Sequence, residues 1–246
     1  MRMQFGIMAV MVFILGAATV TAEEKQGKGV IVALIGDSTV MDNGGWGKAF
    51  ADRFNDQVKV LNFAASGASS KSFHEDKRLP AVLEAKPDYV LIQFGHNDQP
   101  KQKGPHRKTD PATTFRDFLK IYINKTREIG AKPILVSPVC RRTFGTDGKL
   151  ETTLTPWADA MKAVAGEMKV PFIDLHSISM AYHNNIGKEA TMAFNRGSGD
   201  MTHLSPKGAE VTADLIVREL KNVAKDLAAY LTKCRCPGEV ITIYVQ

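Results

Sequence analysis

The feature that most limits the possible folds is an alternation of short apolar runs with helix-length segments. Five runs lack the polar–apolar alternation of half-exposed strands: 30–35, 59–64, 88–94, 133–138 and 170–175. Such runs are typical of strands buried on both faces of a sheet. Helix-like stretches accompany them at 46–54, 79–85, 111–129, 156–168 and 206–231. This order predicts an α/β fold in which parallel strands are joined by right-handed crossovers, with helices on both faces in three α/β/α layers.

The first 22 residues have the pattern of a secretory signal peptide. Arg2 is positively charged, residues 5–20 are apolar apart from glycines, and Val20-Thr21-Ala22 is a small-residue cleavage pattern. A retained membrane anchor is the alternative, but the apolar run is short for a spanning helix. We therefore expect residues 23–246 to form one domain that is secreted or periplasmic, without stable membrane association.

Charge and cysteine content argue against several classes of function. The formal net charge is +6, but the basic residues are scattered, whereas a nucleic-acid footprint needs a clustered stripe. On an exported protein, a mild basic excess is compatible with an acidic polysaccharide. Three cysteines, Cys140, Cys234 and Cys236, are too few for a disulfide framework, and Cys-x-Cys alone cannot hold structural zinc. Cysteine pairing, the role of the strand-like tail 239–245 and the oligomeric state stay open.

Small and polar residues gather where three predicted strands end, in segments 36–39, 65–70 and 95–98. The carboxyl ends of parallel strands meet at one edge of a sheet, which is where open α/β sheets bind ligands. A fourth polar segment, 199–206, precedes the last helix. Any one of these could be an ordinary turn, with Ser38 or Thr39 as a helix N-cap. Together they indicate a functional site.

Ser38, Asp200 and His203 are the residue types of an activated serine nucleophile. A serine hydroxyl needs a base to take its proton, and that base is most often a histidine oriented by a carboxylate. Asp200 and His203 supply both groups from one loop. Backbone N–H groups of Ser38 and Gly67 and the side-chain amide of Asn97 could receive an oxyanion. A metal site would lack a third clear ligand, so we predict none.

These segments resemble the SGNH (GDSL-like) hydrolases. The four family blocks occur in the family's order as Gly36-Asp37-Ser38, Gly67, Gly95-His96-Asn97-Asp98 and Asp200-x-x-His203. Segments 36–40, 44–47, 69–73, 94–99, 138–144 and 202–209 are similar to the rhamnogalacturonan acetylesterase branch. The resemblance implies a flavodoxin-like five-stranded sheet and no metal or organic cofactor. It also implies Ser38 as nucleophile, His203 as base, Asp200 as its orienter, and an oxyanion hole formed by Ser38, Gly67 and Asn97.

The implied activity is the removal of acetyl groups from pectic polysaccharide through an acetyl-serine intermediate. One departure is Ala68, at a position that is often Arg in this branch, which leaves the fine substrate open. A lipase, lysophospholipase or thioesterase would need an apolar acyl groove, whereas the loops after the strands are polar and basic. A non-catalytic carbohydrate-binding protein would not need the complete set of catalytic residues. An α/β-hydrolase would carry Gly-x-Ser-x-Gly, which is absent.

Three charged residues are candidate substrate contacts. Arg141 and Arg142 follow the fourth predicted strand, and a guanidinium fork suits the carboxylate of galacturonate. Internal salt bridges are the alternative for both. Asp98 could contact substrate or cap a turn. Nearby, Asp37 is expected to brace its loop, and His96 to be a structural residue lining the site.

Overall fold

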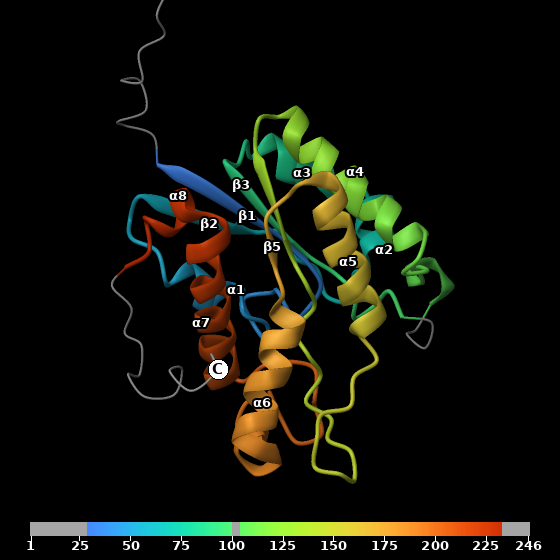
Figure 1. Ribbon diagram of the computed structural model, residues 1–246. Helices are drawn as coiled ribbons and strands as arrows, with labels where there is room; N and C mark the ends of the chain where they lie inside the picture. Colours follow the sequence, from blue (N-terminus) through green and yellow to red (C-terminus); the bar gives the residue numbers. More distant parts are fainter. Residues whose placement is uncertain (1–28, 100–103, 233–246) are drawn as a thin grey trace, which may run out of the picture.

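The computed structural model describes residues 29–99 and 104–232, so the predicted signal peptide, the tail, Cys234 and Cys236 lie outside the described residues. Five parallel strands form one sheet in the order β2-β1-β3-β4-β5 (Figure 1). The strands are β1 (Val30–Gly36), β2 (Val58–Asn62), β3 (Tyr89–Gln93), β4 (Lys132–Val136) and β5 (Phe172–Ile173). This is the flavodoxin-like strand order, so the predicted fold class is confirmed.

Helices cover both faces of the sheet (Figure 1). The helices on one face are α1 (Gly47–Ala51), α7 (Pro206–Val223) and α8 (Lys225–Ala228). The helices on the opposite face are α2 (Ser70–Glu75), α3 (Leu79–Glu84), α4 (Thr114–Glu128) and α5 (Thr155–Met168). The chain also forms a 3-10 turn, η2 (Pro105–Arg107), and a further helix, α6 (Leu175–Met192), which packs against α7.

Alternate residues of each strand supply two separate hydrophobic cores, because successive side chains point to opposite faces of a sheet. In β1, Val32 and Leu34 pack with the α1 and α7 side, whereas Ala33 and Ile35 pack with the α2–α5 side. Strands that are buried on both faces have continuous apolar sequences, and the sequence therefore predicts them well.

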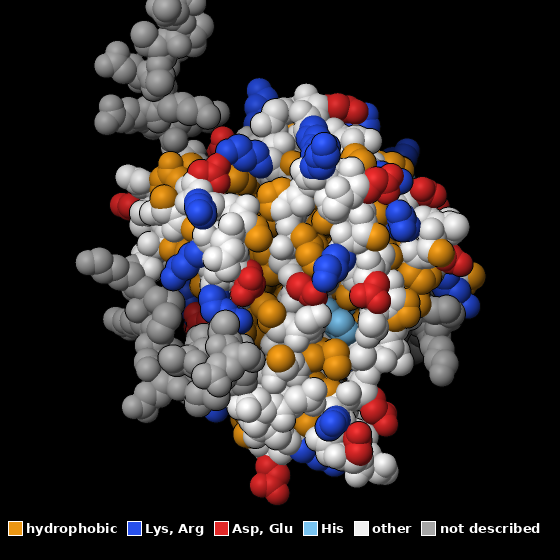
Figure 2. Space-filling view, in the orientation of Figure 1, with side chains coloured by type: hydrophobic (Ala, Val, Ile, Leu, Met, Phe, Trp, Pro, Cys, Tyr) orange, Lys and Arg blue, Asp and Glu red, His pale blue; other side chains and the backbone are white. Residues whose placement is uncertain are grey.

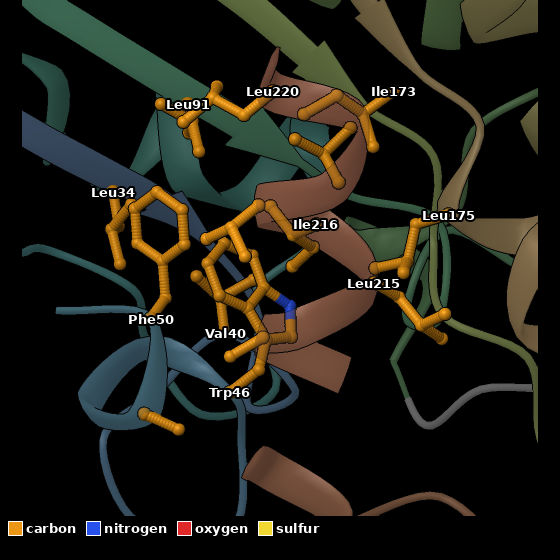
Figure 3. Packing of buried hydrophobic residues seen from close by; sticks show 14 of the residues in the cluster. Leu34, Val40, Trp46, Phe50, Leu91, Ile173, Leu175, Leu215, Ile216 and Leu220 are labelled. Carbon is orange, nitrogen blue, oxygen red and sulfur yellow. The ribbon is translucent and has the colours of Figure 1, made fainter. Parts of the chain in front are cut away.

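The first core holds Trp46 and Phe50 against α7, as Figure 3 shows for Ile216 and its neighbours. Trp46 is fully buried, and its indole Nε1 donates a hydrogen bond to Gln93 Oε1 at 3.1 Å. The Trp46 ring is therefore a core residue that ties the segment after β1 to the end of β3.

Gly36 ends β1 at a point where the chain has no room for a side chain. A Cβ built there would lie 2.5 Å from Val40 Cγ2 and 2.6 Å from Gln93 O, both too close for a real contact. A glycine allows this close approach. The turn that carries Ser38 is thus packed directly onto β3.

Two helices differ from the sequence analysis. The sequence pattern predicts no helix over residues 175–192, where the structure has α6. This helix is interrupted by Gly187, whose φ of 79° is not helical. The last helix, predicted over 206–231, ends at Val223 because Ala224 leaves the helical conformation (φ −145°, ψ 66°) before α8 begins.

The surface seen in Figure 2 carries Lys and Arg side chains interspersed with Asp and Glu side chains. This agrees with the scattered charge in the sequence. Within residues 29–99 and 104–232, none of the helices combines the length and apolar character needed to cross a membrane.

Candidate active site

Ser38, His203 and Asp200 form a continuous hydrogen-bonded chain although Ser38 is far from the other two in sequence. His203 Nε2 lies 2.9 Å from Ser38 Oγ, and His203 Nδ1 lies 2.9 Å from Asp200 Oδ2. Ser38 stands in the turn after β1, and the other two residues stand in the loop before α7. A base within hydrogen-bond reach of a serine, itself oriented by a carboxylate, is the arrangement of an activated nucleophile.

Asp200 is held ionised by the loop it stands on. Burial opposes its charge, but hydrogen bonds from His203 N at 2.9 Å, from the His203 ring and from Thr202 N at 3.2 Å outweigh burial and keep the pKa of Asp200 below its ordinary value. An ionised carboxylate beside Nδ1 fixes the orientation of the imidazole and leaves Nε2 free to accept the Ser38 proton.

The predicted oxyanion donors lie on three adjacent strand ends. A backbone hydrogen bond from Ala65 N to Gly36 O (3.0 Å) holds the segment after β2 against the end of β1. Asn97 Nδ2 donates to Ala68 O at 3.0 Å, which orients the amide and leaves its second N–H available. Gly67 has a φ of +71°, a backbone conformation that favours glycine. These contacts place the candidate donors around the edge that carries Ser38.

Asp98 is enclosed by protein rather than exposed to a ligand. Its carboxylate accepts hydrogen bonds from Ser70 Oγ (2.5 Å), Ser70 N (3.1 Å), Gly95 N (3.0 Å) and Thr109 Oγ1 (2.9 Å), and the residue has no exposed surface. Burial raises the pKa of Asp98 to about 7 against these donors. A direct substrate contact by Asp98, as predicted, does not fit this burial. Through these hydrogen bonds Asp98 instead connects the segments that carry Gly67, Asn97 and Thr109.

Asp37 stabilises the turn that carries Ser38, as expected. Its Oδ1 accepts from Thr39 N at 2.8 Å and from Thr39 Oγ1 at 2.7 Å, and its Oδ2 lies 3.3 Å from His96 Nδ1. Burial opposes the Asp37 charge, but His96 and the Thr39 hydrogen bonds outweigh burial and lower the pKa of Asp37. Both Asp37 and His96 are buried, so this pair supports the turn without facing solvent.

Arg141 and Arg142 point in different directions although they are neighbours. Arg141 is half-buried, and its guanidinium donates to Gln99 Oε1 at 2.6 Å and to His96 O at 3.2 Å, at the rim of the segment that carries Asn97. Arg142 has no exposed surface. A substrate contact therefore remains a proposal for Arg141, while the burial of Arg142 does not fit one.

Arg142 contacts the loop that carries the candidate base. Its Nη2 donates to His203 O and its Nε donates to Asn195 Oδ1, each at 2.6 Å, while its backbone N donates to Met201 O at 2.9 Å. These bonds make Arg142 a positioning residue for His203.

Sequence reasoning missed Arg107, which lies beside Gly67. A Cβ built on Gly67 would lie 2.9 Å from Arg107 Nη1 and 3.2 Å from both Cζ and Nη2, so the guanidinium covers the α-carbon of that glycine. Position 68 holds Ala rather than Arg. This is the one sequence signal that could have prompted a search for a positively charged side chain from another segment.

Comparisons with known proteins agree with this geometry. The model of the GDSL-like lipase/acylhydrolase family matches residues 34–211. The rhamnogalacturonan acetylesterase RhgT of Bacillus subtilis is 39% identical over 225 residues, covering 83% of this chain and 95% of RhgT. A rhamnogalacturonan acetylesterase of Emericella nidulans is 24% identical over 231 residues, covering 85% of this chain and 92% of the relative.

Among solved structures, the crystal structure of the protein YxiM from Bacillus subtilis superposes with a TM-score of 0.69 at 30% identity. The alignment covers 79% of this chain but only 56% of the YxiM chain, so this chain spans little more than half of that relative.

Proposed function

The chain belongs to the GDSL-like lipase/acylhydrolase family, and from that premise we propose that it is an exported carbohydrate esterase that removes acetyl groups from acetylated pectic polysaccharide. The observation that carries the proposal is the Ser38–His203–Asp200 chain, with 2.9 Å between Ser38 Oγ and His203 Nε2. The similarity to RhgT over most of both chains supports the pectic substrate. The signal-peptide pattern of residues 1–22 supports export.

In the proposed first step, Ser38 Oγ attacks the acetyl carbonyl carbon while His203 Nε2 accepts the hydroxyl proton. The carbonyl oxygen becomes an oxyanion that accepts hydrogen bonds from Ser38 N, Gly67 N and Asn97 Nδ2. When this intermediate collapses, the bond between the acetyl carbon and the sugar oxygen breaks. The sugar oxygen takes the proton from His203. Acetyl-Ser38 and a free sugar hydroxyl result.

In the second step, water replaces the sugar. His203 Nε2 takes a proton from the water as the water oxygen attacks the acetyl carbon, and the same donors stabilise the second oxyanion. The proton then returns to Ser38 Oγ as its bond to the acetyl carbon breaks, and acetate leaves. Asp200 keeps the imidazole oriented through both steps and stabilises its protonated form.

The test is acetate release from a panel of acetylated rhamnogalacturonan, homogalacturonan and xylan, with the Ser38→Ala variant as control. The proposal expects faster release from the pectic substrates and none above background with the variant. Equal release from all three polymers would remove the pectic assignment. Hydrolysis of p-nitrophenyl acetate against a long-chain p-nitrophenyl ester tests the acyl group, and preference for the long chain would favour a lipase instead.

A further inference from the structure

Arg107 is held beside the proposed oxyanion hole by backbone and side-chain anchors. Its N–H closes η2 by donating to Gly104 O at 3.2 Å, and η2 packs against α2. Two residues later, Thr109 N donates to Asp98 O at 3.0 Å and Thr109 Oγ1 donates to the Asp98 carboxylate at 2.9 Å. The segment that carries Arg107 is thus anchored, through Thr109, to the same carboxylate that accepts from Ser70 and Gly95 N.

The Arg107 guanidinium has no hydrogen bond or ion pair within residues 29–99 and 104–232. In those ranges every other arginine has at least one such partner for its guanidinium. Arg53, for example, pairs with Asp214 at 2.7 Å, and Arg196 lies 3.7 Å from Asp200. A half-buried guanidinium is usually compensated. Its donors therefore remain available to a ligand.

A guanidinium presents parallel N–H donors that match the two oxygens of a carboxylate. We propose that Arg107 forms a carboxylate-binding subsite beside Gly67, which selects esters whose acetylated sugar is a uronate or is linked to one. This inference rests on the proposed function and assigns the charge selectivity of that site to one residue. The guanidinium of Arg141 already donates to Gln99 Oε1 and His96 O, so it does not offer the same free pair of donors.

The experiment uses the full chain in a Ser38→Ala background, so that an acetylated ligand is bound but not consumed. The ligands are an acetylated oligogalacturonate and its fully methyl-esterified counterpart, in which a neutral methyl ester replaces each carboxylate. Binding is measured by titration calorimetry. The ionised oligogalacturonate is expected to bind about 10- to 100-fold more tightly than the methyl ester, which is the affinity that one charge-assisted hydrogen-bonded pair contributes.

Adding Arg107→Gln should bring the ratio of the two affinities close to one, and Arg107→Lys should keep part of the preference because it retains charge but loses the fork. The matched control is Lys108→Gln, which removes one positive charge from an exposed neighbour and should leave the ratio unchanged. Thermal unfolding of each variant checks the fold.

Two results would overturn the proposal: equal binding of acid and ester by the parent, or an unchanged ratio of the two affinities in Arg107→Gln, whether neither affinity falls or both fall equally. An equal fall of both would assign the Arg107 charge to the acyl end of the site. Titration with acetate separates the two carboxylate sources, because binding of acetate as tight as that of the oligogalacturonate would identify a product site. Acetate release by the unmodified chain is measured separately, so failure of the proposed function is recognised independently.

Discussion

Ser38 follows directly from a strand, whereas His203 stands on a loop that belongs to no strand. The first half of the site, segments 36–39, 65–68 and 95–99, continues from β1, β2 and β3 and is called the sheet-edge half here. The second half, residues 195–205, is called the base loop. Asp37 in the sheet-edge half has no exposed surface, whereas the side chains of Asp200 and His203 in the base loop are 27% and 28% exposed.

The two halves are therefore positioned by different forces. Strand pairing and the packing of Gly36 on β3 fix the sheet-edge half. The base loop is held by individual hydrogen bonds, including Leu204 N to Gly44 O at 2.8 Å and the Arg142 contacts to His203 O and Asn195. Substitution of Ser38 or Asn97 in the sheet-edge half should act mainly on the chemistry, and substitution of a base-loop anchor such as Arg142 should act on chemistry and stability together.

The largest effect is expected from Ser38→Ala, which removes the proposed nucleophile from the sheet-edge half. We expect kcat for p-nitrophenyl acetate to fall about 10⁴-fold or more, because no other group forms the acyl intermediate. The melting temperature should stay within error, since within the described residues the Ser38 hydroxyl gives up one hydrogen bond, that with His203 Nε2. Ser66→Ala, an exposed serine in the same half, is the control. A loss below tenfold would reject Ser38 as nucleophile.

Asn97→Ala should give the second-largest effect. Loss of one oxyanion donor typically costs about 2.7–4 kcal/mol, so we expect kcat to fall about 10²- to 10³-fold with little change in KM. The variant also loses the hydrogen bond to Ala68 O, a modest term for stability. Steady-state kinetics with a short acetyl ester make the measurement. Near-normal kcat would show that Asn97 does not receive the oxyanion.

Arg142→Met tests the base loop. The substitution removes the bonds to His203 O and Asn195, which we expect to lower the free energy of unfolding by about 1–3 kcal/mol. Displacement of the imidazole should also lower kcat about 10- to 100-fold. The matched control is Arg53→Met, which breaks contacts to Asp214 and Glu210 away from the site and should lower stability alone. If both variants behave alike, Arg142 has only a structural role.

The sheet-edge half was predictable from the sequence because strands buried on both faces leave continuous apolar runs, and parallel strands bring their ends together. The base loop has no such periodic signal; the polar segment 199–206 before the last helix and the Asp200-x-x-His203 block indicated it. Periodicity also missed α6, where Gly187 breaks the helical pattern.

Side-chain direction outside regular elements was not predictable. Arg141 and Arg142 look equivalent in sequence, yet one lies at the rim and the other is fully buried. Asp98, beside Asn97, turns inward to Ser70 and Thr109. Arg107 reaches Gly67 from a segment that pairs with no strand, so the proximity depends on tertiary packing that local sequence patterns do not encode.

The smallest expected effect is a pH dependence that compares one carboxylate from each half. The pKa values of Asp37 and Asp200 lie below their ordinary value of 3.8 in the folded chain, against the effect of burial, through His96 and Thr39 in one case and His203 and Thr202 in the other. When a folded pKa is lowered, the unfolded chain binds more protons near that pH, so stability present above 3.8 is lost as the pH falls. Urea unfolding below about pH 4 should show this loss in the parent, and Asp37→Asn and Asp200→Asn should each flatten it. Between 3.8 and about 7 the raised pKa of Asp98 acts in the opposite direction, so that range is excluded from the comparison. Because Asp37 is buried and Asp200 is partly exposed to solvent and salt, the Asp200 contribution should weaken more in high salt. If salt weakens the stability contributions of Asp37 and Asp200 equally, each taken as the difference between parent and variant, the distinction between the halves is contradicted.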